Sequence, residues 1–226
     1  MYLHHFCVTA DERIVDRYKG GFVHRFGREA CCITEQYCAL VYRKIVTKDS
    51  TWLAFEFTGE IRETPEFTSG RCSYPWPFDF AAYVMADNVG KKSLIASSMQ
   101  SAALWVARKE GWTTAPIEDA YRTIVQRNFV FEGVSKKSWL SPSKAYRARV
   151  YFNFDLDGVN LHAVLYRNRN KQEVGRVFLG REIPRLGCLD ECLARGRWVT
   201  DTDFRLATEF GLMRNLLAAD FSSFMR

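Results

Sequence analysis

The sequence predicts an α+β protein in which an antiparallel sheet packs against about four helices. The first observation is the order of segments along the chain: strand-like, helical, strand-like and helical again. This grouping differs from the regular alternation of a doubly wound parallel sheet. The second observation is a three-stranded meander near residues 145–185, where apolar and polar residues alternate. This meander and an N-terminal hairpin are expected to form the antiparallel sheet.

We expect a single domain over residues 1–226, with one possible weak boundary near 133–144. The segment Ser135–Ser143 (SKKSWLSPS) is polar and punctuated, which is typical of a linker. A boundary there would separate an N-terminal part of strands and helices, 1–132, from a basic meander with a C-terminal helix, 145–226.

The first part of the chain has strand-like composition. Tyr2–Val8 and Phe22–Phe26 are expected as short strands. Tyr37–Val46 and Trp52–Thr58 are rich in β-branched and aromatic residues, and a turn-forming segment separates them. They are therefore expected to form the N-terminal hairpin.

The segment CSYPWPF (residues 72–78) places Pro75 and Pro77 around Trp76. Proline lacks a backbone N–H group, which excludes a helix interior or a central strand here. We expect a loop packed over the core, with a presented aromatic surface as the alternative.

The helices are predicted from apolar residues at helical spacing and from capping residues. Pro116 is expected to occupy the favoured first position of one of them. The expected helices run from Asp79, as the capping residue, to Ala86, and over Ser93–Lys109, Ile117–Arg127, Leu189–Ala194 and Asp203–Ala219.

The meander has a register that follows from its turn. A two-residue Asp157-Gly158 turn pairs Leu156 with Val159, and apolar residues then meet along one face. That core face is expected to hold Val150, Phe152, Phe154, Leu161, Leu165 and Leu179. The other face is expected to pair Asn153 with His162 and to carry the rows Arg149–Tyr166–Arg176 and Tyr151–Val164–Phe178.

Positive charge is concentrated in the meander. The formal net charge of the chain is +6, and residues 133–185 alone hold 11 basic and 4 acidic residues. A localised basic stretch is expected for a protein with a polyanionic partner. The alternative is that lysine and arginine only protect exposed sheet edges from aggregation.

Basic and aromatic residues alternate in this stretch, and together they form the predicted binding site. Cations neutralise phosphates, and aromatic rings offer faces on which bases stack. The predicted binding residues are Arg147, Arg149, Tyr151, His162, Tyr166, Arg167, Arg169, Lys171 and Arg176.

The function predicted from these residues is non-catalytic binding of a polyanionic partner, with nucleic acid slightly favoured. The first alternative is an inhibitor, immunity or adaptor-type protein that docks an acidic protein surface on the same face, because arginine and tyrosine are also enriched at protein interfaces. The second alternative is an enzyme whose site is assembled from scattered residues. The sequence leaves the oligomeric state open.

No cofactor, metal ion or catalytic residue is expected. Cys188 and Cys192 lie four residues apart and form only half of a zinc site. Asp155–Gly158 resembles a fragment of a calcium loop, but the hairpin turn explains it. The chain also lacks a nucleophile-elbow serine and a glycine-rich phosphate loop.

The chain has seven cysteines, an odd count, and no secretory signal precedes them. No apolar run approaches the roughly 18 residues that span a bilayer. We therefore expect a cytoplasmic protein with reduced thiols and no membrane partner.

Overall fold

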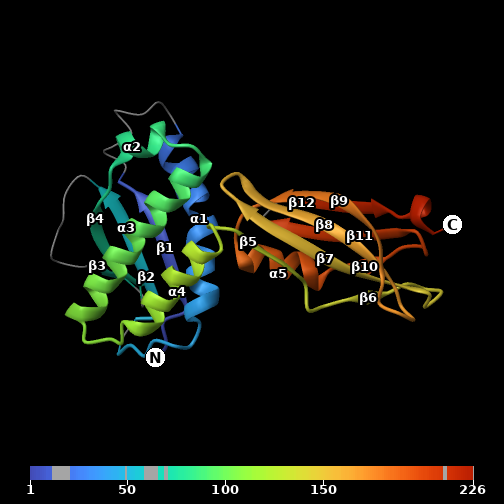
Figure 1. Ribbon diagram of the computed structural model, residues 1–226, viewed down its shortest axis with the longest axis horizontal. Coiled ribbons are helices and arrows are strands. Elements are labelled where there is room, and N and C mark those ends of the chain that lie inside the picture. The colour runs from blue at the N-terminus through green and yellow to red at the C-terminus, as the bar shows by residue number, and fades with distance from the viewer. Residues whose placement is uncertain (12–20, 49, 59–65, 69–70, 211–212, 226) are drawn as a thin grey trace. The chain divides into compact units, whose positions relative to one another are not determined.

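The computed structural model describes residues 1–11, 21–48, 50–58, 66–68, 71–210 and 213–225 (Figure 1). It contains both helices and strands, which confirms the mixed α+β class. The chain divides into two compact units, unit 1 (Met1–Val130) and unit 2 (Phe131–Arg226).

Unit 1 is built on a four-stranded sheet with the order β1-β2-β4-β3. Strands β1 (His5–Ala10), β2 (Trp52–Thr58) and β4 (Arg71–Pro77) are parallel. The short β3 (Glu66–Thr68) is antiparallel to β4. The prediction that the N-terminal sheet is antiparallel is therefore wrong.

The expected N-terminal hairpin and the expected strand at 22–26 are also wrong, because a long helix, α1 (Phe22–Val41), occupies this region. Composition suggested strands, but apolar residues recur here at helical spacing. The residues that α1 buries include Phe22, Phe26, Ala30, Ile33, Tyr37 and Val41. The helix connects β1 to the parallel β2, as parallel pairing requires.

The prolines of CSYPWPF lie in a strand, not in the expected loop. Strand β3 pairs only with Arg71–Ser73, the first residues of β4. Pro75 and Pro77 lie beyond this pairing, and within the described residues β4 has a neighbour there on the β2 side alone. Proline is tolerated at such an edge, which is why β4 continues through both residues.

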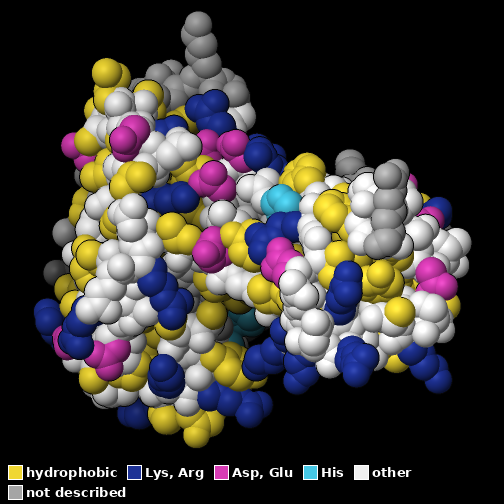
Figure 2. Space-filling model, turned by 45° about the vertical axis from the view of Figure 1, so that its right-hand side comes forward, with side chains coloured by type: hydrophobic (Ala, Val, Ile, Leu, Met, Phe, Trp, Pro, Cys, Tyr) yellow, Lys and Arg dark blue, Asp and Glu magenta, His cyan; other side chains and the backbone are white. Residues whose placement is uncertain are grey.

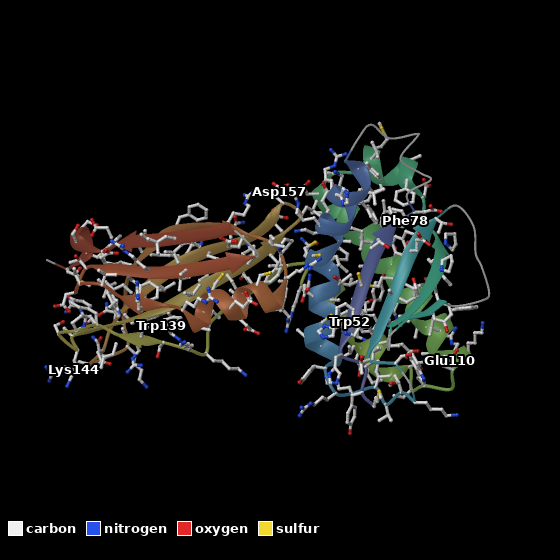
Figure 3. All side chains as sticks on the ribbon, turned by 180° about the vertical axis from the view of Figure 1, so that it is seen from behind. Trp52, Phe78, Glu110, Trp139, Lys144 and Asp157 are labelled. Carbon is white, nitrogen blue, oxygen red and sulfur yellow. The ribbon has the colours of Figure 1, made fainter. Side chains whose placement is uncertain are left out.

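Three predicted helices of unit 1 are confirmed. They are α2 (Phe80–Met85), α3 (Asn88–Lys109) and α4 (Ala115–Gln126). The Asp79 carboxylate caps α2 by accepting a hydrogen bond from the Ala82 N–H at 2.9 Å. Figures 1 and 3 show α3 and α4 on one face of the sheet.

Aromatic rings fill the core of unit 1. Phe26 of α1 is fully buried and meets Phe78, Phe80 and Tyr83 with ring centroids 5.0–5.3 Å apart. The Tyr83 hydroxyl donates a hydrogen bond to the buried carboxylate of Glu29. Contacts of Phe78, Phe80 and Tyr83 therefore hold α2 against α1.

Unit 2 contains two sheets and one longer helix. One sheet has the order β5-β7-β8-β9, with β6 also paired to β7, and the other has the order β10-β11-β12. Its elements are β5 (Phe131–Val134), β6 (Trp139–Leu140), β7 (Tyr146–Asp155), β8 (Gly158–Arg167), β9 (Glu173–Glu182), α5 (Leu186–Ala194), β10 (Arg197–Trp198), β11 (Asp203–Phe210), β12 (Met213–Asp220) and a short 3-10 helix (Ser222–Phe224).

The meander β7-β8-β9 has the predicted strands but a different register. Asp155 pairs with Gly158, so Leu156 and Asp157 form the turn. Every β7–β8 pair is therefore displaced by two residues from the expected one. Side chains alternate with a period of two, so a two-residue displacement keeps each residue on its predicted face.

The β8–β9 pairing is displaced as well, because β9 bulges at two points. One bulge lies between the partners of Leu161 and His162, and the other lies between the partners of Leu165 and Tyr166. Arg176 pairs with Val164, and Phe178 pairs with His162. The predicted rows Arg149–Tyr166–Arg176 and Tyr151–Val164–Phe178 are therefore wrong.

The predicted last helix, Asp203–Ala219, is a hairpin formed by β11 and β12. Phe204 and Leu206 are buried at alternate positions, which is the strand period, and Ala219 is buried opposite Phe204. The short helix predicted over Leu189–Ala194 is confirmed as α5.

The segment 133–144 lies entirely within unit 2, where it contains the end of β5 and the whole of β6. Trp139 of β6 is buried, and its ring lies 5.1 Å from that of Phe204. The indole N–H of Trp198 donates a hydrogen bond to the Trp139 carbonyl at 3.0 Å. Figure 3 shows Trp139 between Lys144 and Asp157, which mark opposite ends of unit 2.

Candidate functional site

The meander has one buried face and one that is largely accessible, which we call the open face. Arg149 and Tyr151 of β7 lie on the open face, whereas Val150 and Phe154 between and beyond them are buried. The rows across β7, β8 and β9 on the open face are Arg147–Tyr166–Glu173, Arg149–Val164–Arg176, Tyr151–His162–Phe178 and Asn153–Asn160–Arg181.

A hollow of about 460 Å³ lies at the end of the open face where β8 finishes. Four of its lining residues are basic and none is acidic, so we call it the cationic hollow. The lining residues are Ser138, Arg147, Arg149, Tyr166, Arg167, Asn168 and Lys171. Five predicted binding residues are therefore brought together here.

Hydrogen bonds hold the walls of the cationic hollow in place. The Arg147 guanidinium donates to the Ser138 hydroxyl at 2.6 Å. The Asn168 backbone N–H donates to the Ala145 carbonyl at 2.9 Å, and its side-chain amide donates to the Lys144 carbonyl at 3.0 Å. The loop after β8 is thus fixed to the segment before β7.

The basic groups of the cationic hollow have no acidic partner in the part of the chain that the structure describes. Within the described residues, no ion pair involves Arg147, Arg149, Arg167 or Lys171. By contrast, Arg176 lies 3.5 Å from the carboxylate of Glu173 on the same open face. Unpaired cations in a concave surface create a positive potential that attracts anions.

Next to the cationic hollow, three rings form a row across the strands. The His162 ring lies 5.8 Å from that of Tyr151 and 5.1 Å from that of Phe178. The Arg176 guanidinium lies 4.5 Å from the centre of the Tyr151 ring. Phe178 remains 55 % exposed, so the row ends in an accessible aromatic ring.

Two groups in this row have shifted pKa values. A hydrogen bond to Glu132, together with burial, raises the pKa of Tyr151. Burial, and then the positive charge of Arg176, lowers the pKa of His162 below its usual value of 6.5. His162 is therefore neutral at pH 7, and the positive charge of the open face comes from arginine and lysine.

Two other basic residues of the stretch 133–185, Arg169 and Lys137, do not line the cationic hollow. Arg169 is exposed in the loop after β8 and does not line the cationic hollow. Lys137 instead donates to the Ala194 carbonyl at 2.9 Å. Figure 2 shows lysine and arginine side chains along the lower edge of unit 2, where Figure 1 places β6.

Sequence reasoning missed Ser138 and Asn168 as lining residues. Ser138 belongs to the polar segment interpreted as a linker, and β6 brings it beside β7. Asn168 directly follows β8 and lines the cationic hollow beside Arg167. In the sequence, the only indication of their role is that they lie near predicted binding residues along the chain.

Within the described residues, no group of three or more His, Cys, Asp or Glu is arranged to hold a metal ion. Cys192 is buried in α5, and burial raises its pKa to about 12. The cationic hollow is lined by neither His162 nor a pair of carboxylates. Its charged lining residues are arginine and lysine, which are groups that could attract an anion.

Comparisons with protein-family models, with curated proteins and with solved structures each found no match to the chain. In the part of the chain that the structure describes, no helix has the length and apolar character needed to cross a membrane.

Proposed function

We propose that the protein is a non-catalytic binding protein that holds a polyanion on the open face of unit 2, with nucleic acid as the favoured ligand. We place it in the cytoplasm, where thiols such as the buried Cys38 and Cys192 stay reduced.

The observation that carries this proposal is the cationic hollow. Four basic residues converge on about 460 Å³ of accessible space with no acidic residue among the lining groups. A bound phosphate would relieve the repulsion between these like charges. Arginine also presents two parallel N–H donors to phosphate oxygens, which adds geometric fit to the charge attraction.

An acidic protein surface is the second candidate, and the exposed ring of Phe178 supports it because aromatic residues and arginine are enriched in protein interfaces. Salt dependence separates the two candidates. Nucleic acid carries condensed counterions whose release makes the logarithm of affinity fall linearly with the logarithm of salt concentration.

The test is binding of fluorescently labelled single- and double-stranded DNA and RNA over a salt series. The double variant Arg147→Gln with Arg149→Gln should weaken binding. If each arginine neutralises one phosphate, the salt slope should fall by roughly 1.4 for a single strand, at about 0.7 per contact.

The matched control is Arg108→Gln with Arg122→Gln, which removes the same charge from exposed positions in α3 and α4 of unit 1. The control should bind like the unmodified protein. Absence of binding to every nucleic acid at low salt would refute the nucleic-acid proposal. Equal weakening by both double variants would show that only net charge matters and would remove the cationic hollow as the site.

A further inference from the structure

We infer that the nucleic acid recognised by the open face is single-stranded, with one base stacked on Phe178 while the backbone reaches the cationic hollow. This inference rests on the proposed function and specifies its ligand. It comes from two neighbouring features of unit 2, the cationic hollow and the aromatic row Tyr151–His162–Phe178.

The first step concerns distance. Arg149 lies one row from Phe178 along the strand direction and two strands away across the sheet. Rows are about 7 Å apart and strands about 4.8 Å apart, so the two backbones are separated by roughly 12 Å. That span corresponds to about three to four nucleotides at 3.4 Å each, and fewer in an extended strand. One short oligonucleotide can therefore use both features.

The second step concerns the path between them. Val164 is fully buried and forms a floor between Arg149 and Arg176. The Arg176 guanidinium lies over the Tyr151 ring, in the same row as Arg149. A backbone that leaves the cationic hollow towards Phe178 therefore passes the Arg176 guanidinium, which also lies 3.5 Å from the Glu173 carboxylate.

The third step concerns the strandedness of the ligand. Phe178 is 55 % exposed, which leaves ring surface for contact with a base. In a duplex the base faces are covered by neighbouring base pairs, so an aromatic ring can stack on a base only after unstacking it. A single strand presents its base faces without that cost.

The experiment uses the full chain and labelled oligonucleotides of about 12 residues, within the site sizes known for single-strand binding domains. Four probes are compared at one low salt concentration: single-stranded DNA, single-stranded RNA, the corresponding duplex DNA, and an abasic strand with the same number of phosphates. The two single strands with bases should bind more tightly than the duplex and the abasic strand.

Phe178→Ala should weaken binding of the single strands by about 5- to 150-fold, the range expected for loss of one base–aromatic stack. It should leave the affinity for the abasic strand unchanged. Phe178→Tyr keeps an aromatic ring and should bind normally, whereas Phe178→Leu keeps an apolar side chain but should bind weakly. Tyr42→Ala removes a 52 % exposed ring from unit 1 and should have no effect.

The outcomes separate this inference from the proposed function. If no probe binds, the proposed function itself fails. If all four probes bind equally and Phe178→Ala changes nothing, while Arg147→Gln with Arg149→Gln still weakens binding, the proposed function stands and the inference is wrong. The abasic comparison needs no variant, so a folding defect of Phe178→Ala leaves the question decidable.

Discussion

His162 illustrates how single residues behave on the open face. It lies between the rings of Tyr151 and Phe178, and its Nδ1 atom is inaccessible with no hydrogen-bond partner among the described residues. Burial and the nearby Arg176 both disfavour a proton on this imidazole. The folded state therefore favours the neutral form of the His162 imidazole.

This environment makes stability depend on pH. The folded-state pKa of His162 is lowered below 6.5, so the unfolded state binds more protons between the two values. Neutral His162 makes its full contribution to the stability of the folded state above pH 6.5, and this contribution is lost as the pH falls through the lowered pKa. Thermal unfolding at pH 7.5 and 5.5 should show a smaller loss for His162→Gln than for the unmodified protein.

Part of this pH dependence should remain in the variant, because burial also lowers the pKa of His5 in unit 1. Adding His5→Gln should reduce the loss further. If His162→Gln and the unmodified protein lose the same stability between pH 7.5 and 5.5, His162 is not a source of the pH dependence.

Buried cysteines allow a second residue-scale prediction. Burial raises the pKa values of both Cys38 and Cys192 to about 12. At pH 8 the thiolate fraction, and with it the alkylation rate, should be about 1,000-fold lower than in the unfolded chain. Peptide mapping after iodoacetamide treatment measures this protection for each cysteine. Prompt labelling of Cys38 in the native protein would disprove it.

At the scale of elements, the β7–β8 hairpin shows why the turn lies at Leu156-Asp157. Leu156 is buried, which draws it into the turn with its side chain inward. Asp157 is exposed and lies 3.1 Å from the Arg181 guanidinium of β9. Gly158 then acts as a strand residue, and a Cβ atom there would meet the Glu182 carbonyl oxygen at 2.6 Å.

Gly158→Ala should therefore lower the free energy of unfolding by about 1–3 kcal/mol, because the backbone of β9 must move. Gly187 of α5 offers a matched control, since nothing lies within 4 Å of a Cβ atom there. Gly187→Ala should be neutral or stabilising by up to about 1 kcal/mol. Urea denaturation compares the two variants, and equal stability would contradict the close contact at Gly158.

Helices and strands could be predicted where the apolar residues follow a single spacing along the chain. They were mistaken where the amino-acid composition favoured a different element from the one that the spacing indicates. The meander and α3 have clear periods and were predicted. Helix α1 is rich in aromatic residues and was mistaken for strands, although Phe22, Phe26 and Ala30 recur every four residues. In β11 the alternation of Phe204 and Leu206 was missed.

At the scale of the whole molecule, charge differs between the two units. Unit 1 has 16 basic and 15 acidic residues, whereas unit 2 has 16 basic and 11 acidic residues. Almost all of the net positive charge therefore belongs to unit 2, which also contains the cationic hollow.

This division predicts that unit 2 binds nucleic acid by itself. A chain of residues 131–226 should fold with strand-rich circular dichroism and unfold cooperatively, because its strands pair within the unit. Its affinity for single-stranded oligonucleotides should lie within about threefold of the full chain, a difference below 1 kcal/mol. Residues 1–130 should not bind. Binding by residues 1–130 alone would place the site elsewhere.

The residues of β7 and β8 that share the open face follow from the sequence alone, because side chains alternate along these two strands and a two-residue displacement preserves that alternation. The sequence also determined where positive charge concentrates. Which residues are neighbours across the strands depends on the tertiary fold. The turn at Leu156-Asp157 and the bulges of β9 moved His162 between Tyr151 and Phe178. Pairing of β6 with β7 brought Ser138 to Arg147, because such contacts depend on strand pairing and not on position along the chain.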